Sequence, residues 1–118
     1  MVHSSYGIIG AGLSVPKKIM NNDDFVQLGL ETSDEWIYSR TGIRQRYIAE
    51  EETSASLASE AALKAIDNAG IDKDEIDLIV VATTTPDYQV FPSVACLVQR
   101  DLGLTKAAAF DISAACTG

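Results

Sequence analysis

Cys116 is the residue of this 118-residue chain whose surroundings most favour catalytic chemistry. It follows Ala107–Ser113, a small and apolar segment typical of a buried strand, and a short link of alanines. A strand, a tight turn and then a nucleophile at the start of a helix is the arrangement of a nucleophile elbow. A helix N-terminus lowers the pKa of a thiol to roughly 3.5–7.5, and its N–H groups can stabilise an oxyanion. The alternative is a buried cysteine that serves as a small apolar side chain.

Trp36 and Arg40 form a second pair with chemical potential. They lie four residues apart in an expected helix, so both side chains project from one face. An indole can stack on an aromatic ring, and a guanidinium can bind a phosphate. Arg44 and Arg46 add positive charge close by in an otherwise acidic chain, which favours an anionic ligand. The alternative is a tryptophan that packs against its own domain with the arginine covering it.

Two other patterns are interpreted as structural. Cys96 lies in the middle of an expected helix and is assigned to the core. Gly7, Gly10 and Gly12 follow the order G-x-x-G-x-G, whereas dinucleotide binding requires G-x-G-x-x-G at the opening of a helix. Pro16 stands where that helix would have to run. We therefore expect a strand whose glycines permit close packing, and no dinucleotide site.

The composition excludes several classes of function. Nine Lys and Arg against 17 Asp and Glu give a net charge of −8, which disfavours nucleic-acid binding because phosphates need a basic face. The longest apolar run, Leu78–Ala82, is far shorter than the ~20 residues of a membrane span, and the start of the chain lacks the basic region of a signal peptide. Two cysteines without an export signal predict a reduced, cytoplasmic protein. His3, the only histidine, is expected at a frayed end, so we expect no metal site built from His and Cys.

The elements that must position these residues alternate between strands and helices, which predicts an α/β fold with a layered, largely covered sheet. Asp77–Thr83 is β-branched and apolar on both faces, as in a central strand that is covered on both sides. The helix that carries Trp36 is expected to begin at Thr32, which forms a capping box with Glu35, and to stop at Gly42. The remaining expected elements are a strand over Tyr6–Leu13, a short helix from Asn21 or Asn22 to Leu28, an extended segment over Arg44–Ala49, a helix from Thr53 to Gly70, a capped turn over Asp72–Glu75, a helix from Pro92 or Ser93 to Gly103, and a strand over Ala107–Ser113.

Five segments together resemble β-ketoacyl-acyl-carrier-protein synthase III, the enzyme that starts type II fatty-acid synthesis. They are Thr32–Ile37 (T-S-D-E-W-I), Arg40–Arg44 (R-T-G-I-R), Leu78–Thr84, Phe91–Ser93 and Ala107–Gly118, which ends in A-A-C-T-G. The resemblance begins at about Gly7 and implies the thiolase fold, a layered α-β-α-β-α arrangement of two similar halves. Residues 1–118 would form most of the N-terminal half, ending just after the nucleophile, and the C-terminal half would lie outside this chain.

The resemblance also implies roles for five residues. Cys116 would be the nucleophile that accepts the acyl group, with its own backbone N–H in the oxyanion hole. Trp36 and Arg40 would hold the adenine-nucleotide end of coenzyme A, with Thr32 as a further candidate. Phe91 would reach across a dimer interface to line the partner's acyl pocket. The family's catalytic histidine and asparagine belong to the second half.

The reaction that the resemblance implies is a condensation through an acyl-cysteine. Its substrates would be an acyl-CoA, most simply acetyl-CoA, and malonyl-acyl carrier protein, with no metal or redox cofactor. A homodimer is implied as well, together with a missing C-terminal half or a complementary chain. Two alternatives stay open: a related condensing enzyme of secondary metabolism with another starter or acceptor, and a non-catalytic fragment that pairs with a complementary chain.

Overall fold

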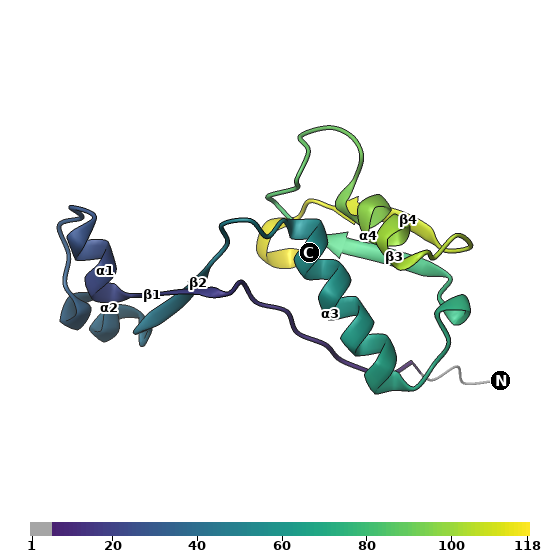
Figure 1. Ribbon diagram of the computed structural model, residues 1–118, viewed down its shortest axis with the longest axis horizontal. Helices are drawn as coiled ribbons and strands as arrows, with labels where there is room; N and C mark the ends of the chain where they lie inside the picture. The colour runs from purple at the N-terminus through teal and green to yellow at the C-terminus, as the bar shows by residue number, and fades with distance from the viewer. Residues whose placement is uncertain (1–5) are drawn as a thin grey trace. The chain divides into compact units, whose positions relative to one another are not determined.

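The computed structural model describes residues 6–118, which form two compact units. Unit 1 comprises residues 6–14 and 53–118, and unit 2 comprises residues 15–52. Each unit contains its own two-stranded sheet (Figure 1). Unit 2 is an insertion between the two segments of unit 1. Its first and last strands pair with each other, and its two short helices lie between them in the sequence.

The sheet of unit 1 consists of β3 (Leu78–Ala82) and β4 (Ala108–Ile112), which run parallel. Leu78 lies opposite Ala108 and Ala82 opposite Ile112. Both strands were expected from their β-branched and small apolar residues, and both are confirmed. Parallel neighbours require a crossover connection, which here contains one helix.

The helices of unit 1 are α3 (Ser54–Ala69) and α4 (Val94–Leu102), and both begin and end as expected. The side-chain oxygens of Thr53 and Ser93 accept hydrogen bonds from backbone N–H groups in the first turns of α3 and α4. Each helix ends at a glycine in the left-handed conformation, which costs glycine little because it has no Cβ. The capped turn after α3 is a short 3₁₀ helix, η1 (Lys73–Glu75).

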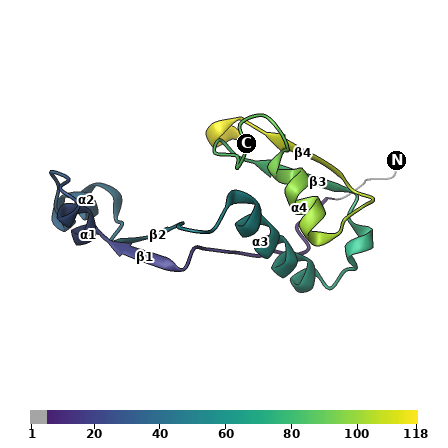
Figure 2. The ribbon, with the colours of Figure 1, turned by 45° about the horizontal axis from the view of Figure 1, so that its top comes forward.

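Helix α4 supplies most of the buried side chains of unit 1. It packs against α3 and against both strands, and Figure 2 shows it between them. Val94 and Ala95 are fully buried, and Ala55 from α3 and Ile79 and Val81 from β3 pack around this helix. Burial of such side chains contributes roughly 25 cal/mol per Å² of apolar surface, so α4 is the main source of stability in this unit.

The sheet is covered on one face only among the described residues. Ile79 and Val81 point to the helices, so the alternating residues Leu78 and Val80 point to the other face and are exposed. On β4, Phe110, which lies opposite Val80, and Ile112, which lies opposite Ala82, are exposed as well. The sequence predicts that this strand is covered on both sides, and the difference arises because α3 and α4 lie on the same face.

The expected strand over Tyr6–Leu13 is wrong: this segment contains no strand. Its backbone bonds to side chains of α3 and not to a neighbouring strand, since Ala11 N–H donates to Asn68 Oδ1 at 3.1 Å and Lys64 Nζ donates to the Leu13 carbonyl at 3.0 Å. The expected close packing is confirmed. A Cβ on Gly10 would lie 2.7 Å from that of Ala69, so the small side chains of α3 and the absence of a Cβ allow this approach.

Unit 2 contains β1 (Lys18–Asn21), α1 (Asn22–Gln27), α2 (Asp34–Thr41) and β2 (Gln45–Ile48). The strands pair antiparallel, with Lys18 opposite Ile48. Helices α1 and α2 and the extended segment at β2 were expected, and β1 was not. The two ends of the unit meet at Glu52, whose carboxylate accepts the N–H of Lys17 at 3.1 Å. Hydrogen bonds from backbone N–H groups, that of Lys17 first, lower the pKa of Glu52 from 4.5 to about 2.

One expected cap is corrected in unit 2. The hydroxyl of Ser33, and not that of Thr32, accepts the N–H of Trp36 at 3.1 Å, so α2 begins one residue later than the capping box predicts. With Ser33 as the N-cap, Glu35 stands one position too early to complete a capping box. The hydroxyl oxygen of Thr32 is buried and has no hydrogen-bond partner within the described residues. The end of α2 at Gly42 is confirmed.

Candidate active site

Cys116 lies at the carboxyl ends of the two parallel strands of unit 1. It lines an open pocket of about 390 Å³ together with Ala82, Ala115 and the threonines Thr83–Thr85. Carboxyl ends of parallel strands meet at one edge of a sheet, which is where open α/β sheets place their ligand sites. The N–H of Thr83 donates to the carbonyl of Ile112 at 3.0 Å and ties the two strand ends together. The Cys116 side chain is exposed, so a substrate in this pocket can reach the thiol.

The backbone around Cys116 is a tight turn. Ala115–Thr117 form a single 3₁₀ turn, η2, in which Thr117 N–H and Oγ1 both donate to the carbonyl of Ala114. Ala115 has a φ of +46°, and it is the one described non-glycine residue with a positive φ. A left-handed conformation costs an alanine on the order of 1 kcal/mol, so the turn that presents Cys116 is locally strained. The expected tight turn of small residues is therefore confirmed.

Asp111 links the strand that leads to Cys116 with the helix beside it. Its carboxylate accepts the backbone N–H groups of Val94 and Ala95, both at 2.8 Å, at the first turn of α4. A carboxylate at a helix N-terminus satisfies N–H groups that have no partner inside the helix and interacts favourably with the helix dipole. The loop just before that turn carries Phe91, whose side chain is 79% exposed. The exposure leaves Phe91 available for a contact with another chain.

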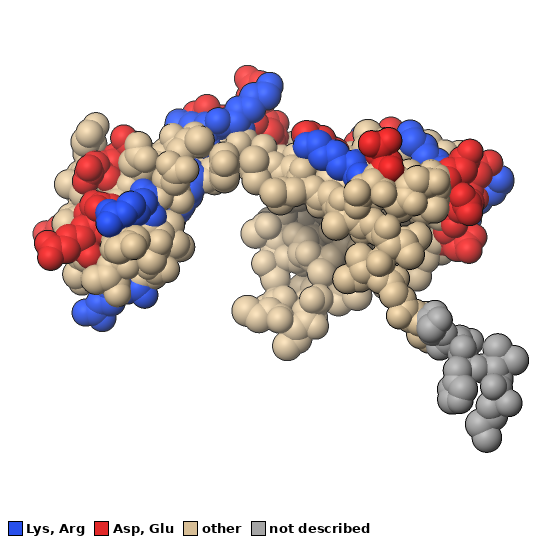
Figure 3. Space-filling model, turned by 90° about the horizontal axis from the view of Figure 1, so that it is seen from below, with Lys and Arg blue, Asp and Glu red and all other residues tan. Residues whose placement is uncertain are grey.

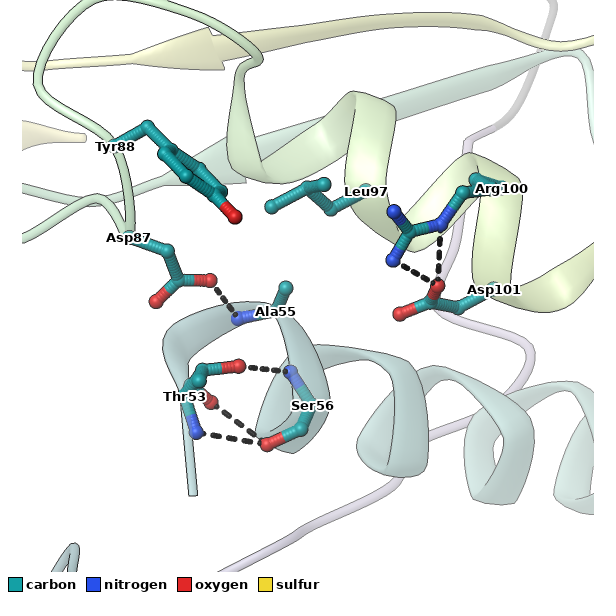
Figure 4. A pocket seen from close by; sticks show the side chains of 8 residues that line it. All are labelled: Thr53, Ala55, Ser56, Asp87, Tyr88, Leu97, Arg100 and Asp101. Atoms are coloured by element: carbon teal, nitrogen blue, oxygen red, sulfur yellow. Dashed lines mark hydrogen bonds and ion pairs between the residues drawn. The ribbon is translucent and has the colours of Figure 1, made fainter. Parts of the chain in front are cut away.

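A second hollow in unit 1 lies beside the first turn of α3, as Figure 4 shows. There the carboxylate of Asp87 accepts the N–H groups of Ser54 and Ala55 at 2.7 and 2.8 Å. The arginine of this hollow, Arg100, is paired with the neighbouring Asp101 at 2.7 Å. The charged groups and helix N–H groups that could receive a ligand are thus already paired within the chain, and this hollow organises the fold.

Trp36 and Arg40 lie on one face of α2, as their spacing predicts. The Arg40 guanidinium carbon is 5.3 Å from the centre of the Trp36 ring, within the range of a cation–π contact. Trp36 is 55% exposed, so it does not serve as a core residue of its own unit. Arg44 and Arg46 also belong to unit 2, so this unit carries three of the chain's four arginines. An exposed indole beside a guanidinium suits a ligand with an aromatic ring and a phosphate.

Charge and the remaining sequence candidates are distributed as follows. On the face shown in Figure 3, acidic side chains gather at one end of unit 1, and much of the rest of that unit's surface carries no charge.

Cys96 is half-buried, and its sulfur lies 3.9 Å from the carbonyl of Ala109, so it packs against β4. His3 lies outside the described residues. Within residues 6–118, no group of three His, Cys, Asp or Glu side chains is placed to hold a metal ion, and no helix is long and apolar enough to cross a membrane.

Two features of the site regions were not predicted from the sequence. The threonines Thr83–Thr85 line the Cys116 pocket, and the available signal was their position directly after a strand parallel to the one before Cys116. Asn22 was considered only as a helix cap, but its side chain is 1% exposed and forms the polar centre of unit 2. Nothing in the local sequence distinguishes it from the exposed Asn21 beside it.

The chain is similar to β-ketoacyl-acyl-carrier-protein synthases III of several bacteria. It is 58% identical over 112 residues to the synthase III of Ehrlichia canis and 52% identical over 115 residues to that of Desulfitobacterium hafniense, covering 94% and 97% of this chain. In both cases it spans 34% of the relative's length. No family model matches the chain.

The chain is also similar in structure to solved enzymes of this kind. The crystal structure of the synthase III from Aquifex aeolicus superimposes with a TM-score of 0.89 at 50% identity, over 94% of this chain and 35% of that one. The priming β-ketosynthase of the R1128 polyketide pathway superimposes with a TM-score of 0.87 at 38% identity, over 94% of this chain and 33% of that one. The fold of this chain is therefore that of the matching third of these thiolase-like condensing enzymes. Within this class, the chain is a homologue of the β-ketoacyl-acyl-carrier-protein synthase III enzymes over about a third of their length.

Proposed function

We propose that the chain forms the part of a β-ketoacyl-acyl-carrier-protein synthase III that carries the nucleophile and the residues that bind coenzyme A, Trp36 and Arg40. The observation that carries this proposal is the exposed Cys116 thiol in a pocket at the carboxyl ends of two parallel strands. Identity of 50–58% to enzymes of that name supports it. The relatives at 52–58% identity carry that name, which favours the fatty-acid reaction over secondary metabolism, whereas solved structures at 38% identity include enzymes of both kinds.

The chemistry takes place in two halves at Cys116. The thiolate attacks the thioester carbonyl of an acyl-CoA, most simply acetyl-CoA, a C–S bond forms to the cysteine, and coenzyme A leaves as a thiolate. Malonyl-acyl carrier protein then loses carbon dioxide, and the electron pair of the broken C–C bond attacks the acyl carbonyl. The new C–C bond gives the β-ketoacyl product, and the cysteine thiolate is released. The Cys116 N–H contributes to the oxyanion hole, and the family's histidine and asparagine are supplied by the rest of the enzyme.

The proposal extends to assembly and location. Phe91 lines the acyl pocket of a second copy in a homodimer, and its 79% exposure supports an intermolecular contact. The free thiols of Cys96 and Cys116 support a reduced, cytoplasmic setting. The chemistry itself requires no metal or redox cofactor, because the nucleophile is a thiol and the carbanion comes from decarboxylation.

A chimaeric enzyme tests the proposed reaction. Residues 1–118 replace the matching third of the Aquifex aeolicus enzyme, so that the chain is completed by the remainder of a known synthase. We expect this chimaera to condense acetyl-CoA with malonyl-acyl carrier protein and to release carbon dioxide and coenzyme A in equal amounts. A chimaera that folds as a dimer but neither condenses nor exchanges acyl groups would contradict the proposal.

A second prediction concerns the binding of coenzyme A by Trp36. Trp36→Ala in the chimaera should raise the KM for acetyl-CoA about tenfold and leave kcat largely unchanged, because stacking holds the nucleotide end and not the reacting carbonyl. Stacking of a base on an aromatic side chain contributes roughly 1–3 kcal/mol, which sets this scale. Tyr47→Ala is the matched control, since Tyr47 is an equally exposed aromatic residue of unit 2 that lies on β2. A fall in kcat with an unchanged KM would make Trp36 a structural residue.

A further inference from the structure

Unit 2 has almost no apolar core to hold its helices. Among residues 15–52, only Ile37 and Asn22 are buried, and Asn22 is the more buried of the two at 1% exposure. Asparagine is rarely buried unless its amide is fully hydrogen-bonded, because an unpaired buried amide costs roughly 1–3 kcal/mol. The orientation of the helices in this unit therefore depends on what the Asn22 amide binds.

The Asn22 side chain binds both ends of helix α2. Its Nδ2 donates to Oδ1 of Asp34, the first residue of α2, at 2.9 Å, and to the carbonyl of Ile43, just past the end of α2, at 2.7 Å. Its Oδ1 accepts from Arg46 Nη1 at 3.0 Å. Two acceptors on one side and an arginine on the other fix the orientation of the amide, since only its nitrogen can donate. Both Nδ2 hydrogens are thereby used.

The hydrogen bonds of Asn22 to Asp34, Ile43 and Arg46 form a clamp on α2. Neighbouring groups strengthen this clamp. The second carboxylate oxygen of Asp34 binds Arg44 at 2.6 Å, and the backbone N–H of Asn22 donates to the Arg44 carbonyl at 3.1 Å. The clamp thus joins the start of α1, the two ends of α2 and the beginning of β2 in one network. Trp36 and Arg40 lie on α2 between the two clamped ends.

We infer that Asn22 is a positioning residue for coenzyme A recognition: its amide holds both ends of α2 and thereby fixes the face that bears Trp36 and Arg40. This inference rests on the proposed function for the identity of the ligand. The side chain itself is buried, so a ligand at the surface of unit 2 cannot reach it directly. Aspartate has the same shape but no donor, so at this position it would place a second carboxylate against Asp34.

The test uses the chimaera with Asn22→Asp and Asn22→Ala, and with a substitution at Asn21 as the control. Asn21 is adjacent and exposed, and it is the N-cap of α1, so the control variant is Asn21→Ser, which keeps a side-chain oxygen at the cap and removes no contact of Asn22. We expect both Asn22 variants to raise the KM for acetyl-CoA about tenfold, equivalent to roughly 1.4 kcal/mol of binding free energy. The kcat and the KM for malonyl-acyl carrier protein should stay within about twofold of the parent values. Asn21→Ser should leave all three constants unchanged.

A second readout does not depend on catalysis. Trp36 is the only tryptophan of this chain, so its fluorescence reports on α2 once any tryptophan in the Aquifex aeolicus part is replaced by phenylalanine. We expect the Asn22 variants to increase quenching of Trp36 by acrylamide, and Asn21→Ser to leave it unchanged. Unchanged KM and unchanged quenching in both Asn22 variants would overturn the inference, as would an equal loss in kcat and in both KM values. If the parent chimaera is inactive, the proposed function fails, and the quenching alone decides whether Asn22 orders α2.

Discussion

Cys116→Ser in the chimaera is expected to form no acyl-enzyme and to lose condensation by ~10³-fold or more. A serine hydroxyl is far harder to ionise than a thiol, so serine at this position is a much weaker nucleophile near neutral pH. The pocket around position 116 should remain intact, because the side chain is exposed and the substitution removes no packing. Mass spectrometry after incubation with acetyl-CoA should show one acetyl group on the parent enzyme, mapped to Cys116, and none on the variant.

Cys96→Ser is the matched control for this experiment. Cys96 is half-buried on α4 and its sulfur contacts the Ala109 carbonyl, so the substitution perturbs packing without touching the pocket. We expect this variant to be acetylated and to condense at close to the parent rate. Acetylation mapped to Cys96, or full acetylation of Cys116→Ser, would contradict the assignment of Cys116 as the nucleophile.

The sequence predicts the elements well where local chemistry determines them. Helix α3 begins at a capping threonine and ends at Gly70, and α4 ends at Gly103, because these residues act through their own backbone and immediate neighbours. The setting of Cys116 was predictable for a similar reason, since a small apolar strand and a turn of alanines precede it. The pairing of Trp36 with Arg40 follows from helical spacing alone.

Features that depend on distant parts of the chain were not predictable in this way. Residues 6–13 have the composition of a strand, but a strand also needs a ladder partner, and here the segment bonds to α3 side chains. The buried clamp of Asn22 depends on Asp34, Ile43 and Arg46, which the fold brings together from three positions along the chain. Pocket residues Thr83–Thr85 meet Cys116 only because β3 and β4 run parallel.

Residues 1–118 expressed alone are expected to associate rather than to remain monomeric. The uncovered sheet face presents Leu78, Val80, Phe110 and Ile112 to solvent, and cross-strand neighbours such as Val80 and Phe110 make it continuous. Contiguous exposed apolar patches drive association, and a chain of this size buries only about 60–70% of its unfolded surface even when complete. We therefore expect oligomers or aggregates in size-exclusion chromatography with light scattering, a broad unfolding transition, and no acylation by acetyl-CoA at a useful rate.

Two double variants and the addition of a second chain test whether the uncovered sheet face causes that association. Charged residues on the uncovered face, Val80→Lys with Phe110→Glu, should shift the isolated chain towards the monomer, because opposite charges on facing residues remain compatible with the sheet. The same charges at Val90 and Tyr88, which are exposed on the loop before α4, should have a smaller effect. Adding the remaining two thirds of the Aquifex aeolicus enzyme as a separate chain should restore solubility and activity together. A monomeric isolated chain that unfolds cooperatively and gives sharp NMR spectra would show instead that the two units are stable by themselves.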